Sequence, residues 1–213
     1  MKTYLKLALP PVIFKAAKTL QNRLRGDDTL FDGDDRLFKK TVKDAKVYAE
    51  YGCGSSTIWV AKNCEARIFS VDTSKDWVQH VKRKLLKNSI QIEITDVDVG
   101  ELGEWGRPVN YSKRSDFSNY TTSIWNYNQK PDVVLIDGRF RVSCFLTTLI
   151  HAEPGTKVFF DDYTTRPHYH VVEEFIKIHD VCGRQALFIV PQDHEQSKSL
   201  LIKEAQKFSY VLD

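Results

Sequence analysis

A chain of 213 residues with 42% hydrophobic residues can bury a full core as one domain, without disulfides or structural metals. A net charge of +3 with no concentrated basic groove argues against a nucleic-acid-binding protein. Four cysteines without a C-x-x-C pair favour a reduced, cytoplasmic compartment over a secreted, disulfide-stabilised class.

The first 45 residues are expected to form a basic helix and an acidic linker, ahead of a main domain over residues 46–213. Residues 1–26 hold six basic residues and no acidic one, and apolar residues recur at helical spacing from Pro11 onward. This pattern predicts either a helix packed on the sheet or a peripheral helix against an anionic inner-membrane surface. Residues 26–35 are acidic and turn-rich, which indicates a linker.

Residues 47–72 predict a strand, a glycine turn, a helix and a second strand that ends in a carboxylate. Gly52 and Gly54 would let backbone amides approach a ligand at the start of a helix. Asp72 lies 18 residues after Gly54, where a carboxylate would bind ribose hydroxyls. Thr57 occupies the position at which a dinucleotide fingerprint has glycine, so a nicotinamide-dependent dehydrogenase is only a minor alternative.

The segment EYGCGSS, from Glu50 to Ser56, resembles motif I of the class I S-adenosylmethionine-dependent methyltransferases. The resemblance implies an α/β, Rossmann-like fold whose mostly parallel sheet has about seven strands with helices on both faces. It also implies S-adenosylmethionine as the cofactor. Asp98 and Val99 would lie beside its adenine, or Asp96 if the register is shifted. The implied cofactor-binding residues are Glu50, Gly52, Gly54, Ser55, Ser56, Asp72, Thr73, Asp98, Val99 and Asp137.

Helices and strands continue to alternate after residue 72. Helices are predicted at 77–87, 140–151 and 168–178, and strands at 66–71, 90–97, 131–137, 157–160 and 185–190. Residues 197–207 predict a helix or a mixed segment, and residues 210–212 an edge strand. An insertion at about 100–130 holds six aromatic residues. It predicts either an aromatic wall for an acceptor or an extra helix with Phe117, Tyr120 and Trp125 packed on the sheet.

Acidic residues at the predicted strand ends should meet at one edge of the sheet. Asp137 in LIDG, with Asp161 and Asp162 in FFDDY, resembles the acidic set of metal-dependent O-methyltransferases of the catechol and macrolide-sugar types. That resemblance implies a Mg²⁺ ion held by these three carboxylates, although the catechol family has Asp-Asn at the last two positions. Alternatively, Asp137 faces the cofactor's amino group and Asp162 caps the following helix.

Basic and aromatic residues follow these acids in loops at the same edge. We expect Arg139, Arg141, Tyr163 and Arg166 to bind an anionic or polyhydroxyl acceptor, and Asp137, Asp162 and His168 to act in catalysis, with His168 as a base. Residues 45–190 are also similar to bacterial methyltransferase-like proteins, some of which have relatives in cell-surface glycan pathways. The function implied is O-methylation of a small polar or glycan-type acceptor. The alternative is a non-catalytic binding or assembly protein that retains the fold. No oligomeric state is predicted.

Overall fold

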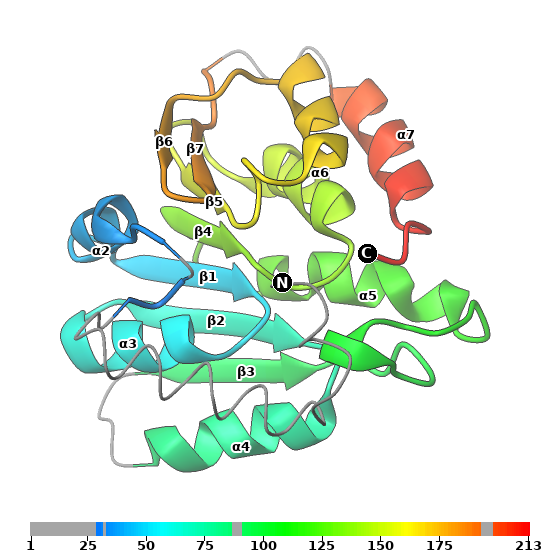
Figure 1. Ribbon diagram of the computed structural model, residues 1–213, viewed down its shortest axis with the longest axis horizontal. Helices are drawn as coiled ribbons and strands as arrows, with labels where there is room; N and C mark the ends of the chain where they lie inside the picture. Colours follow the sequence, from blue (N-terminus) through cyan, green and yellow to red (C-terminus); the bar gives the residue numbers. More distant parts are fainter. Residues whose placement is uncertain (1–28, 32, 87–90, 193–197) are drawn as a thin grey trace, which may run out of the picture.

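The computed structural model describes residues 29–31, 33–86, 91–192 and 198–213, so the basic helix predicted over residues 1–26 lies outside it. The described strands form one sheet in the order β3-β2-β1-β4-β5-β7-β6 (Figure 1). Strands β1 to β5 are parallel, and β7 is antiparallel to both β5 and β6. The predicted α/β, Rossmann-like architecture is confirmed. The strands are β1 (Val47–Tyr51), β2 (Arg67–Asp72), β3 (Ile92–Asp96), β4 (Val133–Ile136), β5 (Lys157–Phe160), β6 (Asp180–Cys182) and β7 (Gln185–Ile189).

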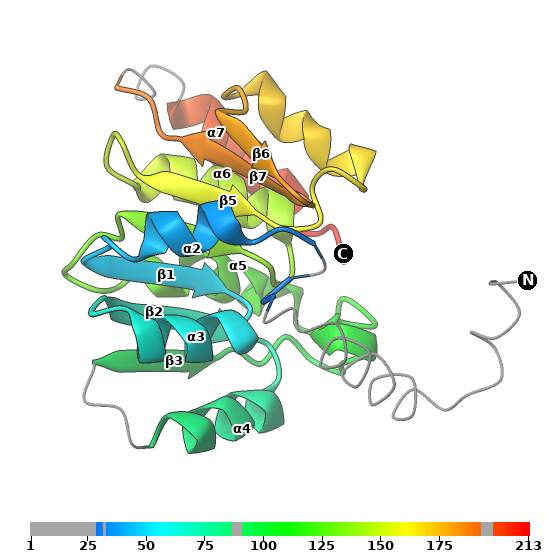
Figure 2. The same ribbon diagram turned by 60° about the vertical axis from the view of Figure 1, so that its left-hand side comes forward.

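Helices cover both faces of the sheet (Figure 2). The α-helices are α2 (Arg36–Val42), α3 (Ser55–Asn63), α4 (Lys75–Leu85), α5 (Phe117–Thr122), α6 (Arg141–His151) and α7 (Lys198–Phe208). Short 3₁₀-helices are η2 (Glu104–Gly106), η3 (Arg114–Asp116), η4 (Ser123–Trp125) and η5 (Pro167–Glu174). No helix in the described ranges is long and apolar enough to cross a membrane.

The sheet separates two apolar cores, because the side chains of a strand alternate between its faces. In β4, Val134 and Ile136 face the core under α5, α6 and α7, whereas Val133 and Leu135 face the core under α2, α3 and α4. All four residues of β4 are buried. This explains why the strand reads as a continuous apolar run in the sequence, as central parallel strands do.

The structure differs from the sequence-based expectations at the two ends of the domain. Phe31 and Phe38 are buried with ring centroids 5.3 Å apart, and the Asp35 carboxylate accepts a hydrogen bond from the Leu30 N–H at 2.7 Å. The described part of residues 26–35 therefore packs on the domain instead of forming a free linker, and the core extends below residue 46. At the other end, residues 210–212 form no strand, and β6 was not predicted.

The other differences concern short helices. The helix predicted over residues 168–178 is the 3₁₀-helix η5, which begins at Pro167. In the insertion, Phe117, Tyr120 and Trp125 are buried on α5 and η4, so the prediction of an extra helix packed on the sheet is correct for these three rings. Trp105 and Tyr111 remain exposed at 77% and 49%.

Candidate functional site

The loops that follow β1 and β4 contact each other directly at the carboxyl edge of the sheet. Gly52 has φ +95°, and a Cβ atom there would lie 2.8 Å from the Gly138 Cα. A Cβ atom on Gly138 would lie 2.0 Å from the Tyr120 hydroxyl and 2.8 Å from the Gly52 nitrogen. The Tyr120 hydroxyl also accepts a hydrogen bond from the Arg139 N–H at 3.2 Å. Both glycines are therefore required by the close approach of the two loops.

Glu50 supports the glycine loop from inside the core. Its side chain is fully buried and accepts hydrogen bonds from the hydroxyls of Tyr48 at 2.8 Å, Ser56 at 2.7 Å and Thr57. Thr57 in turn accepts a hydrogen bond from the Gly54 N–H at 2.8 Å. Burial raises the pKa of Glu50, while these hydroxyls oppose the shift. Glu50 therefore orders the start of α3, which differs from the direct cofactor contact expected from the sequence.

Asp72 connects the loops that follow β1 and β2. Its Oδ2 accepts a hydrogen bond from the Cys53 N–H at 3.1 Å, and its Oδ1 accepts one from the Ser74 N–H at 3.0 Å. Burial raises the pKa of this carboxyl, and the backbone donors act in the opposite direction. A carboxylate oxygen can accept more than one hydrogen bond, so this carboxylate can also accept from the hydroxyls of a ligand.

The insertion reaches the end of β2 through η2. The Thr73 hydroxyl donates to the Gly106 carbonyl at 2.7 Å, and a Cβ atom on Gly106, where φ is +72°, would lie 2.6 Å from Thr73 Oγ1 and 4.0 Å from Asp72 Oδ1. The neighbouring Trp105 has φ 62° and an exposed ring. This places η2 and Trp105 beside the carboxylate that ends β2.

Asp98 and Val99 have different environments beyond the end of β3. The Asp98 side chain is 68% exposed and paired with Lys113 of the insertion, and this lysine lowers the pKa of Asp98. Val99 is buried in the core. Asp96 ends β3 beside Asp72 in the register of the sheet and is exposed.

Three carboxylates at the ends of β4 and β5 form a cluster with three arginines. Asp137, Asp161 and Asp162 can bring one oxygen each within 4.8 Å of the others. Their cationic partners are Arg141, Arg166 and Arg184, which come from α6, the η5 entry and the start of β7. The ion pairs are Arg141 to Asp137 at 3.1 Å and to Asp162 at 3.3 Å, Arg166 to Asp162 at 2.8 Å, and Arg184 to Asp161 and, at 3.1 Å, to Asp162.

The members of this cluster differ in their access to a ligand. The Asp161 side chain is 0% exposed and the Asp162 side chain 14%, whereas that of Asp137 is 30% exposed. Burial raises the pKa of Asp137 well above its usual range, and the neighbouring Asp161 charge adds to the shift. Asp137 is therefore the member that a ligand can reach most readily.

The carboxylate cluster does not suit a divalent metal as it is arranged here. Both oxygens of Asp161 are bonded to the Arg184 guanidinium, and Asp162 pairs with all three arginines. A Mg²⁺ ion would need these same oxygens as ligands and would lie next to guanidinium charges.

The sequence matches no protein-family model, and no curated protein matches it. Among solved structures, a methyltransferase-like protein from Silicibacter pomeroyi is 33% identical, with a TM-score of 0.70 over 80% of this chain and 92% of that one. This chain belongs to the class I S-adenosylmethionine-dependent methyltransferase family. Methyltransferases from Geobacter sulfurreducens (16% identity, TM-score 0.52, 88% of this chain and 95% of that one) and Pyrococcus furiosus (13%, 0.53, 83% and 98%) share the fold.

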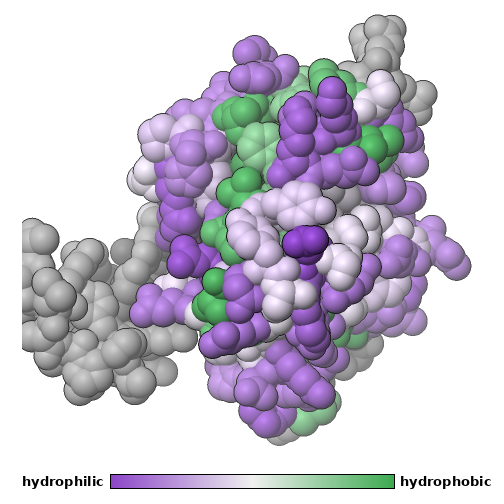
Figure 3. Space-filling view, turned by 90° about the vertical axis from the view of Figure 1, so that its right-hand side faces the viewer, coloured by the Kyte–Doolittle hydropathy of each residue, from purple (hydrophilic) through white to green (hydrophobic). Residues whose placement is uncertain are grey.

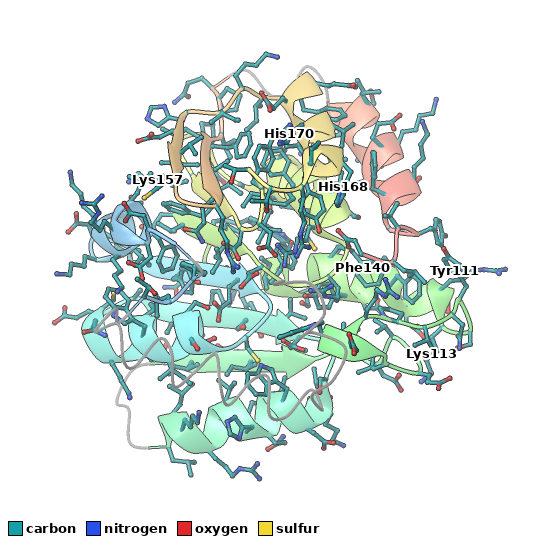
Figure 4. The ribbon with its side chains drawn as sticks, in the orientation of Figure 1. Tyr111, Lys113, Phe140, Lys157, His168 and His170 are labelled. Carbon is teal, nitrogen blue, oxygen red and sulfur yellow. The ribbon has the colours of Figure 1, made fainter. Side chains whose placement is uncertain are left out.

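The residues expected to bind the acceptor of this methyltransferase fall into two groups, one internal and one exposed. Arg141 is 3% exposed, its guanidinium donates to the carbonyls of Gly138 and Asp161, and Tyr163 is 1% exposed with its hydroxyl bonded to Glu173. These two side chains are internal, unlike the expectation that they contact an acceptor. Arg166 is 41% exposed. His168 is exposed, and its ring contacts that of Tyr169 in a tilted arrangement, with an interplanar angle of 57° (Figure 4).

Arg139 is the arginine at this edge whose guanidinium has no acidic partner among the described residues. It is half-buried, and its guanidinium forms no ion pair with any residue that the structure describes. Its backbone is fixed by Tyr120 on one side and by the Cys144 thiol, which donates to its carbonyl at 3.3 Å, on the other. A fixed backbone with an unpaired guanidinium suits recognition of an anionic group.

Sequence reasoning missed four residues that shape the site. The sequence indicates Thr57 as a residue that can cap the helix and as a departure from a dinucleotide fingerprint, but not that it bonds both Glu50 and Gly54. Cys53 and Tyr120 act through a backbone N–H and a hydroxyl that no spacing rule indicates. Asp161 and Asp162 are expected from the sequence to help hold a Mg²⁺ ion, and nothing in the local sequence identifies their partner Arg184, which follows 22 residues after Asp162.

Proposed function

We propose that this family member transfers a methyl group from S-adenosylmethionine to an oxygen atom of a small polar or glycan-type acceptor. The observation that supports the cofactor position is the carboxylate of Asp72, which the N–H groups of Cys53 and Ser74 orient at the end of β2, where it could accept from ribose hydroxyls. When bound, S-adenosylmethionine supplies the sulfonium methyl group. Gly52, Gly54, Ser55 and Thr73 border the same loop edge, where the cofactor would be held.

The acceptor end of the site combines a reachable carboxylate with cationic side chains. Asp137 is partly exposed and has a raised pKa, so it suits either a hydrogen bond to the cofactor's amino group or acceptance of a proton from the acceptor hydroxyl. Arg139 and Arg166 provide positive charge on the same side, and His168 is an exposed second candidate for a base. An acceptor with hydroxyl and anionic groups fits this set.

The buried arginine network supports this arrangement without contacting the acceptor. Arg141 and Arg184 neutralise Asp161 and Asp162, which keeps the loops after β4 and β5 in place beside Asp137. Since these loops fix the backbone of Asp137 and Arg139, the two side chains can present their groups from a rigid support.

Isothermal titration of the protein with S-adenosylhomocysteine tests the proposed cofactor. We expect binding by the wild type and loss of at least about tenfold in affinity for Asp72→Ala, because two charge-assisted hydrogen bonds to ribose would be removed. Glu65→Ala is the matched control: it removes an exposed acid two residues before the opposite end of the same strand. Thermal unfolding of both variants checks that the fold is kept.

Repeating the titration with Mg²⁺ and then with EDTA tests the assignment of the acidic cluster. We expect the same affinity in both, because arginines neutralise the three carboxylates. A wild type that binds neither S-adenosylmethionine nor S-adenosylhomocysteine would contradict the proposed function and favour a non-catalytic binding or assembly protein. Binding with unchanged affinity in Asp72→Ala would reject the assigned cofactor position.

A further inference from the structure

A pocket of about 550 Å³ lies between the insertion and the C-terminal helix, apart from the carboxylate cluster. Cationic side chains reach it from both sides: Arg114 from η3, and Lys203 and Lys207 from α7. Ser115, Ser118 and Tyr210, which carry hydroxyl groups, also line the pocket. The side of the molecule on which the parallel strands end is mainly hydrophilic (Figure 3).

The charge of this pocket is only partly balanced. Lys207 pairs with Glu204 at 2.6 Å, one turn away on α7. Arg114 and Lys203 form no ion pair with any residue in the described ranges. The pocket lining contains no acidic residue, so about two positive charges are available to an incoming anion.

The geometry of the lining favours a phosphoryl group over a carboxylate. A single guanidinium can hold a planar carboxylate in a two-bond fork, and no further cations are required. Here the cations come from two separate elements, so donors approach from more than one direction. A tetrahedral group with three terminal oxygens can use donors arranged in this way. The volume exceeds that of a phosphate alone and matches a small organic phosphate.

The pocket is linked to the candidate active site by the last residues of the chain. The Tyr111 hydroxyl donates to the Tyr210 carbonyl at 3.1 Å, which ties the insertion to the end of α7. Three residues later, the Asp213 side chain accepts a hydrogen bond from the Arg141 N–H at 3.3 Å. Three residues span at most about 11 Å, so the Tyr210 end of the pocket lies within a small molecule's length of the α6 start, where Arg141 pairs with Asp137.

We infer that this pocket binds a phosphoryl group of the acceptor, so that the acceptor is a small organic phosphate whose hydroxyl lies near Asp137. The inference rests on the proposed methyl transfer for the identity of the ligand as acceptor. The phosphoryl group would lie between Arg114 and Lys203, and the rest of the molecule would extend along residues 210–213 toward Arg139.

Two-dimensional amide NMR of the full chain locates such a site directly. Inorganic phosphate, glucose 1-phosphate and glucose serve as probes, each added with and without S-adenosylhomocysteine. We expect the two phosphates, but not glucose, to shift resonances of residues 114–118 and 203–210. Arg114→Gln combined with Lys203→Gln should weaken phosphate binding by at least about tenfold, because two charge-assisted contacts are lost. These exposed residues form no ion pair with a described residue, so the fold should be kept.

A charge-matched control separates local contacts from the general field of the protein. Arg83→Gln with Lys84→Gln removes two exposed positive charges from α4, on the other face of the sheet, and should leave phosphate binding unchanged. Equal weakening in both double variants, or no shift with either phosphate, would overturn the phosphoryl site. The variants should bind S-adenosylhomocysteine as the wild type does, because the substituted residues lie outside the proposed cofactor site. If the wild type does not bind S-adenosylhomocysteine, the proposed function is rejected, while the phosphate-binding pocket is still tested by the phosphate titrations.

A transfer assay then tests whether the bound phosphate is the acceptor. Radiolabelled S-adenosylmethionine is offered with a set of sugars, each in free and phosphorylated form. We expect methyl incorporation only into phosphorylated sugars, and a KM raised about tenfold with unchanged kcat in the Arg114→Gln, Lys203→Gln variant. Equal incorporation into both forms, or a KM that the variant leaves unchanged, would reject the assignment of this pocket to the acceptor.

Discussion

Glu50 is a carboxylate surrounded by hydroxyl groups and shielded from water. Its three side-chain donors fix the loop that carries Gly52 and Gly54, so one buried charge sets the start of α3. A buried carboxylate is costly in its ionised form, and hydrogen bonds offset only part of that cost. The residue therefore links the stability of the domain to the geometry of the proposed cofactor loop.

The raised pKa of Glu50 gives a pH-dependent prediction for Glu50→Gln. A carboxyl whose pKa is higher in the folded than in the unfolded protein stabilises the fold fully below its unfolded pKa, about 4.3, and this contribution is lost as pH rises through the folded pKa. The free energy of unfolding of the wild type should therefore fall relative to that of the variant as pH rises above about 4. Urea unfolding at several pH values measures this difference. A difference in the free energy of unfolding that is constant with pH would mean that the pKa of Glu50 is not raised in the folded protein.

At the scale of elements, the contact between the loops after β1 and β4 depends on two glycines. Gly52 and Gly138 lie so close that neither leaves space for a side chain, and Tyr120 from α5 closes the contact from the third side. The insertion therefore forms part of the structure that holds the strand ends together. Its buried rings and the exposed Trp105 serve different roles, which the aromatic composition alone does not separate.

Gly138→Ala should destabilise the domain by at least about 2 kcal/mol, because the new methyl group would overlap the Tyr120 hydroxyl and two backbone atoms. Gly54→Ala is the comparison for stability, since its Cβ would meet only the Trp77 ring at 3.9 Å. Its free energy of unfolding should change by less than about 1 kcal/mol. Thermal or urea unfolding of both variants gives the test. Similar stabilities would show that the loops can separate without loss.

The pairing of Arg184 with Asp161 joins β7 to the end of β5. Arg184→Gln would leave a fully buried carboxylate without its partner, and we expect a loss of about 3 to 5 kcal/mol in the free energy of unfolding. Arg166→Gln removes a more exposed guanidinium from Asp162 and should cost less than about 1 kcal/mol. Denaturant unfolding distinguishes the two. Equal losses of unfolding free energy in the two variants would mean that the burial of Asp161 does not determine how much Arg184 stabilises the fold.

At the scale of the whole molecule, the sequence predicts local patterns better than long-range partners. The bounds of β5 match the expected strand over residues 157–160, since a continuous apolar run is a local signal. The antiparallel β7 between β5 and β6, and the arginines around Asp161 and Asp162, depend on contacts between distant segments. Strand-end acids were therefore found from sequence, whereas their burial and their partners required the fold.

The same distinction applies to the candidate residues. Asp72 and Asp137 stand at the strand ends where the motif spacing predicts them, because strand length and turn length determine those positions. The internal placement of Arg141 and Tyr163 could not be predicted, because the direction of a side chain after a strand depends on the packing of α6 and η5. The sequence predicts that Arg141 and Tyr163 contact an acceptor, whereas in the structure both side chains are internal and support the neighbouring loops.

The antiparallel direction of β7 also determines where the polypeptide leaves the domain. Because β7 runs back to the amino edge of the sheet, α7 returns the chain to the carboxyl edge, and Asp213 meets the first residue of α6. Any polypeptide attached after Asp213 would emerge beside the first turn of α6, next to the proposed acceptor side of the site. Kinetic and binding studies of this protein are therefore better done without a C-terminal fusion.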